Sequence, residues 1–446
     1  MGCDIKEFLS RLPVILLVIT FGTGSWVAIN GMWVELPLFV ALGIPEGYNL
    51  ASYLVIIIQL ANIGPLTFTL ANWWAPKGLK IESYVICILF IIGITSCALL
   101  VFFWDVQTTW AIDNSLHSTA LLCLAFFLSI VDCTSSVAFT PFMARFKSLY
   151  LTWYFVGEGF SALLPSLVAL AQGVGSDECV ANYTYTDTVI VDNHTYTVNC
   201  TDWVQQPKAA NFPPEDFFWF LFCMMSCSAI AFVLLNVLPL AKREYVTVGS
   251  TLTRQNTSTT STLQSTSTTS STESHSMLQR SQDATGDHGT IIKDVDVEIK
   301  PDKISTEQQL QIPGGLLTRT QYAYLFCVLG YTNALSNGVL ASIQSYSAGA
   351  YGLNTYLLAS ALSSIANPVA CFLVIAAPSV KLSVVGLTAL LGSSTGAYCL
   401  AMAILSPTPP LQFETLGSVF IVSELNLQQF HSHKAGSEIP FPFFQE

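Results

Sequence analysis

Nine apolar runs follow one another along the chain. Each is close to the roughly 20 residues that a helix needs to cross the hydrocarbon core of a bilayer. The predicted spans are residues 13–34, 50–71, 81–103, 118–141, 150–171, 217–240, 321–345, 356–377 and 382–405. The pattern therefore predicts an all-α protein that crosses a membrane several times.

The first run contains polar and aromatic residues that an ordinary membrane anchor does not need. On a continuous helix one face would carry Gly22, Trp26, Asn30, Trp33 and Pro37, and small residues would lie on a neighbouring face. Small residues let a second helix approach closely. This stretch predicts a helix that lines a cavity for a planar polar molecule. For Trp33, near the end of the run, the alternative is an aromatic anchor at the membrane surface.

Composition supports the membrane assignment. Hydrophobic residues make up 52% of the chain and charged residues only 10%, whereas soluble domains carry about 25% charged residues. The formal net charge is −12 and no basic patch appears, which excludes nucleic acid as a partner. The bilayer is the expected partner, and the sequence defines no oligomeric state.

The basic residues predict the orientation. Lysine and arginine gather at alternate connections, on the side that also holds residues 1–12, so the N-terminus is expected in the cytosol. The loop 172–214 is then extracellular. It contains three N-glycosylation sequons, starting at Asn182, Asn193 and Asn199, and two cysteines that are expected to form a disulfide, Cys179 and Cys200. Residues 241–318 form a Ser/Thr-rich cytosolic loop that is expected to be disordered.

Short motifs recur in order between the first three spans and the last three. Asn30-Gly31 matches Asn337-Gly338, Asn62 with a nearby proline matches Asn367-Pro368, and a Gly-Ser/Thr motif recurs in the third pair, with offsets between 299 and 307 residues. We expect two parallel, related halves of the major-facilitator type, with substrate bound between them. The alternative is that such residues recur generally in polytopic helices.

Those halves are unequal. Residues 13–240 hold six spans, residues 319–405 hold three, and residues 406–446 are expected to form a divergent extracellular tail without a span.

Several polar residues fall inside the predicted spans, where such groups mark candidate functional sites. Candidates for substrate contact are Trp26, Asn30, Trp33, Asn62, Ser136, Asn333, Asn337 and Gln344. Candidates for gating or proton sensing are Glu35, Asp132 and Glu158, for which a structural hydrogen-bonding role is the alternative. Asn62 has the alternative of satisfying backbone groups at a proline kink.

The expected substrate is neutral. No lysine or arginine lies in any predicted span, whereas a phosphorylated or carboxylated ligand would usually require one. Amides, hydroxyls and tryptophans suit an uncharged planar solute with many hydrogen-bonding edges. No nucleophile–base pair, metal cluster or phosphate loop appears, so neither an enzyme nor a bound cofactor or metal is expected.

Several long stretches closely resemble one known family. They are GSWVAINGMWVELPL, YLVIIIQLANIGPL, IVDCTSSVAFTPFM, YFVGEGFSALLPSLVALAQG and LSSIANPVA, and they resemble the vertebrate riboflavin transporters (solute carrier family 52). The resemblance implies sodium-independent uptake of riboflavin at the plasma membrane, by a facilitative or proton-sensitive route. A nucleoside-type transporter and a cell-surface receptor are the alternatives.

The end of the chain departs from the family pattern. The family is expected to have eleven spans, and residues from about Glu424 resemble nothing in it. The chain is therefore expected to be a truncated or altered form with little uptake.

Overall fold

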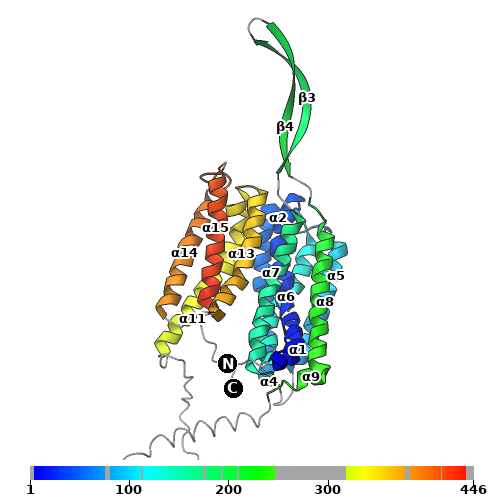
Figure 1. Cartoon of the computed structure of the whole chain (residues 1–446), viewed down its shortest axis with the longest axis vertical. Helices are drawn as coiled ribbons and strands as arrows, with labels where there is room; N and C mark the ends of the chain where they lie inside the picture. The colour runs from blue at the N-terminus through cyan, green and yellow to red at the C-terminus, as the bar shows by residue number, and fades with distance from the viewer. Residues whose placement is uncertain are drawn as a thin grey trace, which may run out of the picture. The chain divides into compact units, whose positions relative to one another are not determined.

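The computed structural model describes residues 5–75, 81–111, 114–173, 177–191, 194–207, 210–246, 318–376, 382–412 and 414–437. Helices account for most of them (Figure 1). The first half contains α1 (Ile5–Thr23), α2 (Val27–Ala41), a 3-10 turn η1 (Gly47–Asn49), α3 (Leu50–Ala61), α4 (Ile63–Trp74), α5 (Ile81–Phe103), α6 (Thr119–Met143), α7 (Ser148–Gln172), α8 (Pro214–Val237) and α9 (Pro239–Lys242). The second contains α11 (Arg319–Asn333), a π-helix η2 (Ala334–Leu340), α12 (Ala341–Gly349), α13 (Leu353–Ala376), α14 (Leu382–Ile404) and α15 (Thr415–Ser437).

The predicted all-α polytopic architecture is confirmed. Seven of the described helical segments are long and apolar enough to cross a membrane, and the bent pair α1–α2 makes eight. The expected second span corresponds to Gly47–Trp74, and the seventh to Ala323–Gly349. The expected eighth span begins as the shorter apolar helix Leu353–Ala366 within α13.

Residues 406–446, predicted to form a tail without a span, contain a further helix of the bundle that is not among the described segments long and apolar enough to cross a membrane. After α14 the chain turns and forms α15, which packs along α13 and α14 (Figure 1). Ile421 and Leu425, one helical turn apart, are buried there. The apolar part of α15, Thr415–Leu427, is short. Its helical character depends on the neighbouring helices more than on its own hydropathy.

The core of the first half is a cluster of aromatic rings around the end of α1. Phe21 stacks on Phe139 of α6, with ring centroids 4.5 Å apart, and lies 5.8 Å from Phe232 of α8. Phe142 and Tyr154 complete the contacts from α6 and α7. These rings fix α1 against three other helices immediately before the chain leaves helical geometry.

Two glycines let α1 and α7 approach backbone to backbone. A Cβ on Gly157 would lie 2.2 Å from the carbonyl oxygen of Ile19, and a Cβ on Gly22 would lie 2.5 Å from that of Tyr154. No side chain fits at either position without moving backbone. This contact was not predicted, because Gly22 was assigned to the face of Trp26. Gly24 and Gly31, which lie on the predicted small-residue face, instead pack closely against Ser228 and Leu221 of α8.

The two halves meet near the end of the bundle that carries the β-hairpin, called here the hairpin end. α13 packs against α2 and α7, and α12 packs against α3. Ser345 Oγ donates to the carbonyl of Tyr48 at 2.7 Å, Ser52 Oγ donates to the carbonyl of Ser342 at 3.1 Å, and Tyr346 hydrogen-bonds Asn49. Toward the opposite end, α11 packs against α14 and α15 of its own half.

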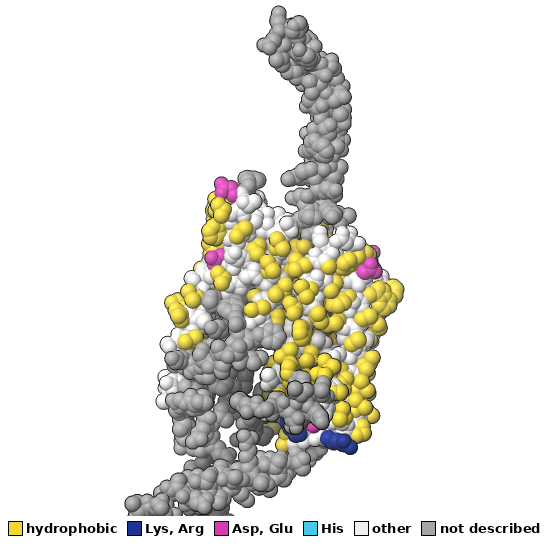
Figure 2. Space-filling view, in the orientation of Figure 1, with side chains coloured by type: hydrophobic (Ala, Val, Ile, Leu, Met, Phe, Trp, Pro, Cys, Tyr) yellow, Lys and Arg dark blue, Asp and Glu magenta, His cyan; other side chains and the backbone are white. Residues whose placement is uncertain are grey.

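The surface supports a membrane setting. In Figure 2 hydrophobic side chains cover most of the middle of the visible face, and Lys and Arg side chains lie at the end opposite the hairpin. Many large apolar side chains on the helices are exposed, Ile91 and Leu390 among them. Such a surface is stable against lipid and not against water.

The loop predicted to be glycosylated forms an antiparallel hairpin of β3 (Asp177–Val191) and β4 (His194–Pro207). Asn182 lies at an irregularity of the ladder and Asn199 pairs with Thr186, while Asn193 lies outside the described residues.

The register of the hairpin does not bring its two cysteines together. Cys179 is opposite Gln205 and Cys200 is opposite Tyr185. A disulfide requires Cα atoms within about 7 Å of each other, and partners this far apart along a ladder exceed that distance. The disulfide therefore finds no support in this register and stays a prediction.

Candidate functional site

The first span is broken in its middle, between α1 and α2. The two helices meet at an angle of 52°, and Gly24, Ser25 and Trp26 form a turn between them. Part of the sequence prediction is therefore wrong. The face drawn from Gly22 to Pro37 assumed one continuous helix, and the turn separates Gly22 from the rest. Trp26, Asn30 and Trp33 still follow one another at helical spacing along α2.

Polar side chains of α6 satisfy the backbone groups that the break exposes. The N–H of Ile29, in the first turn of α2, donates to Asp132 Oδ2 at 2.8 Å. On the α1 side of the break, Ser135 Oγ donates to the carbonyl of Ser25 at 2.7 Å. Helix ends inside a membrane need such partners, because no water is present to replace them.

Trp26 and Asn30 lie beside this break and are half-buried. Trp26 Nε1–H donates to Ser136 Oγ at 3.1 Å, and Asn30 Nδ2 donates to Ser161 Oγ of α7 at 3.3 Å. The structure thus brings together three of the predicted contact residues, Trp26, Asn30 and Ser136. It adds Ser161, whose hydroxyl faces the same cluster.

The remaining predicted contact residue of α2 lies elsewhere. Trp33 is half-buried and packs against the hydrophobic core.

The seventh span is irregular directly after the position that corresponds to the break in the first, since the offset of 307 residues relates residues 24–26 to residues 331–333. Residues Ala334–Leu340 form a π-helix that contains Asn337, the counterpart of Asn30 in the repeat. Helical irregularities of this kind often occur at functional sites. Paired interruptions in the corresponding spans of two halves mark the binding site in transporters built from repeats. The predicted relationship between the halves stays a prediction.

The other predicted polar residues of the second half make local contacts. Asn333 and Asn337 are exposed and hydrogen-bond each other, with Asn337 Nδ2 donating to Asn333 Oδ1 at 3.2 Å. Gln344 Nε2 donates to Ser360 Oγ at 3.2 Å. No direct hydrogen bond between the described residues connects these three to Trp26 or Asn30.

Asn62 separates α3 from α4, and its side chain is exposed. Asn62 Nδ2 lies 3.4 Å from the carbonyl oxygen of Ile58 and 3.3 Å from Oε1 of Gln59. The contact with Ile58 is the backbone-satisfying role that the sequence allowed beside a proline. The side chain of its counterpart Asn367 lies outside the described residues.

The three candidate carboxyl groups have different surroundings. Asp132 is fully buried, and one of its oxygens accepts the N–H of Ile29. Glu35 is fully buried beside Gln172, and neither of its oxygens makes a hydrogen bond of ordinary geometry within the described chain. Glu158 is half-buried in α7, next to the Gly157 contact with α1. A buried carboxyl group with few hydrogen bonds is costly to ionise.

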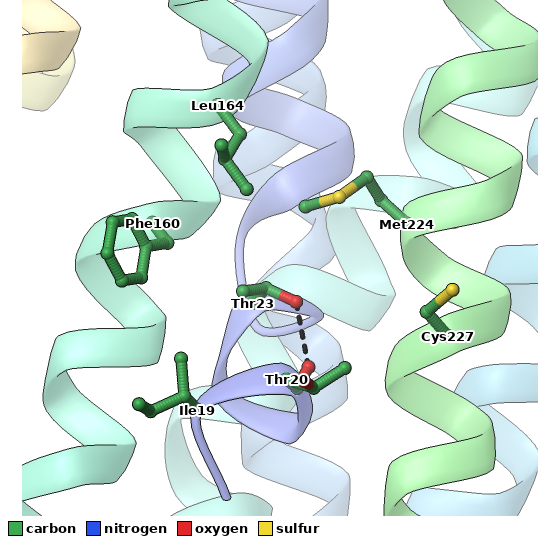
Figure 3. Close-up of a pocket in the computed structure, with 7 residues that line it drawn as sticks. All are labelled: Ile19, Thr20, Thr23, Phe160, Leu164, Met224 and Cys227. Carbon is green, nitrogen blue, oxygen red and sulfur yellow. Dashed lines mark hydrogen bonds between the residues drawn. The ribbon is translucent and has the colours of Figure 1, made fainter. Parts of the chain in front are cut away.

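A groove runs along the last turns of α1, between α7 and α8 (Figure 3). It has a volume of about 310 Å³ and is lined by Ile19, Thr20, Thr23, Phe160, Leu164, Met224 and Cys227. Both threonine hydroxyls donate to carbonyls of α1 itself, at 2.9 Å for Thr20 and 2.7 Å for Thr23. This groove therefore has apolar walls and lacks the amides expected to contact a planar polar solute.

One buried pair was missed at the sequence level. Glu46, before η1, and His117, before α6, are each 5% exposed, and His117 Nδ1 lies 3.3 Å from Glu46 Oε1. Both residues fall between predicted spans, where nothing in the hydrophobic pattern signals burial. Their contact depends on the loops folding against each other.

Comparison with known proteins decides the family. Residues 10–432 match the model of the family described as solute carrier family 52, riboflavin transporter. The chain belongs to this family of riboflavin transporters.

Individual members are similar along most of their length. The chain is 42% identical over 406 residues to riboflavin transporter member 3-B of Danio rerio, covering 91% of this chain and 83% of that protein. It is 38% identical over 429 residues to member 3 of Homo sapiens, covering 92% and 84%. Against Homo sapiens member 2 the identity is 36% over 410 residues.

These matches settle two expectations. The substrate expected from the resemblance, riboflavin, is the one that the family name carries, and neither the nucleoside-type transporter nor the receptor is supported. The family match also runs past Glu424 to residue 432, so the expectation that family resemblance ends near Glu424 is wrong. The matched region includes most of α15.

Proposed function

We propose that this riboflavin transporter takes up its substrate across the plasma membrane along a path between its two halves, with Trp26 and Asn30 contacting the vitamin. The observation that carries the proposal is the break in the first span. It places an indole and an amide side by side, half-buried, at the middle of a membrane helix. Riboflavin has a flat, uncharged three-ring system with hydrogen-bonding edges. Stacking on an aromatic side chain and pairing with amides would recognise both features.

Ser136 and Ser161 extend this site by holding the two side chains. Asn333, Asn337 and Gln344 are proposed to contribute from the second half, because Asn337 lies in the π-helix that corresponds to the first turns of α2. Asn62 and Trp33 are weaker candidates, since their contacts are local or with the core. Glu35 and Glu158 are proposed to gate transport or sense protons. Asp132, the third candidate, accepts the backbone N–H of Ile29, so we propose a structural role for it.

The proposed orientation puts the N-terminus in the cytosol and the hairpin outside. The hydrogen bonds that η1 and α3 make with α12 would then close the extracellular side, as in a state that opens toward the cytosol. The proposed transport is sodium-independent and either facilitative or proton-sensitive.

Uptake of radiolabelled riboflavin in cells that express the chain tests this function. The sequence led us to expect little uptake from a truncated chain. Because the family match reaches residue 432 and α15 packs along α13 and α14, we now expect saturable uptake that survives replacement of sodium by choline, measured at pH 5.5 and 7.4 to reveal any proton dependence. Excess unlabelled riboflavin should abolish the signal and excess nucleoside should not. Uptake equal to that of untransfected cells, at confirmed surface expression, would refute the proposal.

Glycosylation tests the orientation separately. Glycosidase treatment should shift the wild-type band, and changing Asn182, Asn193 and Asn199 together to Gln should remove the shift. An unchanged band would place the hairpin in the cytosol. Non-reducing peptide mapping of the same sample tests the predicted disulfide, which requires a register different from the one described.

A further inference from the structure

The break between α1 and α2 exposes backbone groups where no water can satisfy them. Trp26 occupies the cap position of α2, and its side chain makes no capping hydrogen bond. The N–H groups in the first turn of a helix have no acceptor within the helix, and leaving one unsatisfied in hydrocarbon costs several kcal/mol. The break persists only if another element supplies acceptors and donors.

A single stretch of α6 supplies groups on both sides of the break, and Ser228 of α8 adds a donor to the carbonyl of Phe21 at 2.8 Å. Asp132 Oδ2 accepts the N–H of Ile29 on the α2 side, and Ser135 Oγ donates to the carbonyl of Ser25 on the other side. The next residue, Ser136, accepts the indole N–H of Trp26 at 3.1 Å. Asp132 and Ser135 are both fully buried, so their geometry is fixed by packing. One helical turn therefore holds both edges of the break and the indole that lies between them.

We propose that Asp132 and Ser135 are positioning residues. They hold the break between α1 and α2 and thereby set where Trp26 points. In this role Asp132 acts through its fixed acceptor oxygen and neither gains nor loses a proton during transport. The effect on transport rests on the proposed contact between Trp26 and riboflavin, whereas the effect on the break does not.

The Asn variant separates an acceptor from a proton carrier. Asp132→Asn keeps a carbonyl oxygen that can accept the N–H of Ile29, but it cannot titrate. Asp132→Ala removes the acceptor and leaves that N–H unsatisfied. Ser135→Ala removes the contact with the Ser25 carbonyl and the bond that Ser135 Oγ makes within α6 to the carbonyl of Asp132, both at 2.7 Å. It leaves the acceptor of the Ile29 N–H in place, so it remains informative if Asp132→Ala does not fold. Ser129→Ala is the matched control, because Ser129 is equally buried on α6 and hydrogen-bonds only within its own helix, to Ala125.

Initial rates of radiolabelled riboflavin uptake against concentration and pH, at equal surface expression, give the first test. We expect Asp132→Asn and Ser129→Ala to keep the wild-type KM and pH profile. Asp132→Ala should raise KM about tenfold, the equivalent of losing roughly 1.4 kcal/mol of binding, and Ser135→Ala should raise it less. If Asp132→Asn instead abolishes uptake or flattens the pH profile, Asp132 is a proton carrier and the proposal is overturned. Unchanged KM in both alanine variants, with an unchanged break, would also overturn it.

Cryo-electron microscopy of the variants in lipid nanodiscs gives a test that does not involve riboflavin. Asp132→Ala should change the 52° angle between α1 and α2 and separate Trp26 from Ser136, while Asp132→Asn should preserve both. Trp26→Ala in the uptake assay distinguishes the proposed contact between Trp26 and riboflavin from the positioning role of Asp132 and Ser135. If it leaves KM unchanged, the proposed contact with riboflavin is wrong, while an altered break in Asp132→Ala would still support positioning. A break that is unchanged in Asp132→Ala refutes positioning whatever the uptake.

Discussion

Glu46 Oε1 lies 3.3 Å from His117 Nδ1 and also accepts the backbone N–H of Ser118 at 2.8 Å. The carboxylate thus connects the loop after α2 to the residue that precedes α6. Two residues further along that loop, the carbonyl of Tyr48 accepts a hydrogen bond from Ser345 of the second half. The buried pair therefore fixes the segment through which the first half touches the second at the hairpin end.

Replacing Glu46 by Ala should destabilise the protein. The change leaves the buried N–H of Ser118 without its acceptor, which costs about 1–3 kcal/mol. Thermal unfolding of purified protein in lipid nanodiscs should show a lower midpoint for Glu46→Ala, with Glu46→Gln closer to wild type because it keeps an acceptor oxygen. Glu414→Ala is the control, since Glu414 is exposed. Equal midpoints for Glu46→Ala and Glu414→Ala would contradict a structural role for the pair.

At the opposite end of the bundle, Lys147 Nζ donates to Glu244 Oε2 at 2.8 Å. Burial by itself would raise the pKa of Glu244, but the hydrogen bond and charge of Lys147, together with smaller effects of Tyr150 and Arg11, outweigh it and lower that pKa. A lowered carboxyl pKa means that the ionised form stabilises the fold. The contribution is complete above the ordinary value for glutamate, about 4.3, and is lost as the pH falls through the lowered value.

Lys147→Met should therefore reduce stability at neutral pH and leave it unchanged at strongly acidic pH. The expected loss is small, about 0.2–1 kcal/mol, because Lys147 is 46% exposed and solvent screens the pair. Unfolding midpoints of wild type and variant measured from pH 3 to pH 7 should diverge only toward neutral pH. Lys242→Met controls for the loss of one positive charge near the same end. If the midpoints of wild type and Lys147→Met differed by the same amount at every pH, the ion pair with Glu244 would not explain the loss of stability.

The sequence predicted the membrane class, the family and most of the spans, because each rests on long apolar runs and on extended matches. It could not predict the break in the first span. No proline lies at Gly24, Ser25 or Trp26, and the groups that stabilise the turn come from α6, 103 and 110 positions away in the chain. A helix that breaks for tertiary reasons looks continuous in a periodicity analysis.

The candidate site was predicted with similar limits. Residue type and membrane depth identified Trp26, Asn30 and Ser136 as candidates, and the structure brings the three together. Ser161 was harder to select, because its hydroxyl donates to the carbonyl of Glu158 in its own helix, as serines in apolar helices usually do. Its contact with Asn30 uses the same oxygen as an acceptor. α15 was missed for a different reason. Its apolar stretch is too short to signal a span, and its buried face exists only against α13 and α14.

Trp26→Ala should weaken riboflavin binding by removing the stacking surface. Stacking of a base on an aromatic side chain contributes about 1–3 kcal/mol, and an isoalloxazine ring should be similar, so KM for uptake should rise by one to two orders of magnitude. Trp26→Phe keeps an aromatic face but loses the hydrogen bond to Ser136, so its effect should be smaller. Trp74→Ala is the matched control, because Trp74 is 77% exposed at the end of α4. If Trp74→Ala raised KM as much as Trp26→Ala, stacking at the break would not explain the loss.

The backbone contact between α1 and α7 gives a sharper test of packing below the break. In Gly157→Ala the new Cβ would lie 2.2 Å from the carbonyl oxygen of Ile19 and 3.0 Å from the Cα of Gly22. Both are backbone atoms and cannot rotate away, so the helices must separate, at a cost of about 1–3 kcal/mol or more. Gly330→Ala makes the same chemical change in α11, where a Cβ meets nothing within 4 Å, and alanine is favoured over glycine in a helix by roughly 0.5–1 kcal/mol. The midpoint of thermal unfolding in nanodiscs should therefore be lower for Gly157→Ala and equal to wild type or higher for Gly330→Ala.

Since α1 ends at the break that carries Trp26, riboflavin uptake should fall in Gly157→Ala and persist in Gly330→Ala. Similar stability of the two variants would mean that α1 and α7 do not pack this closely in the membrane.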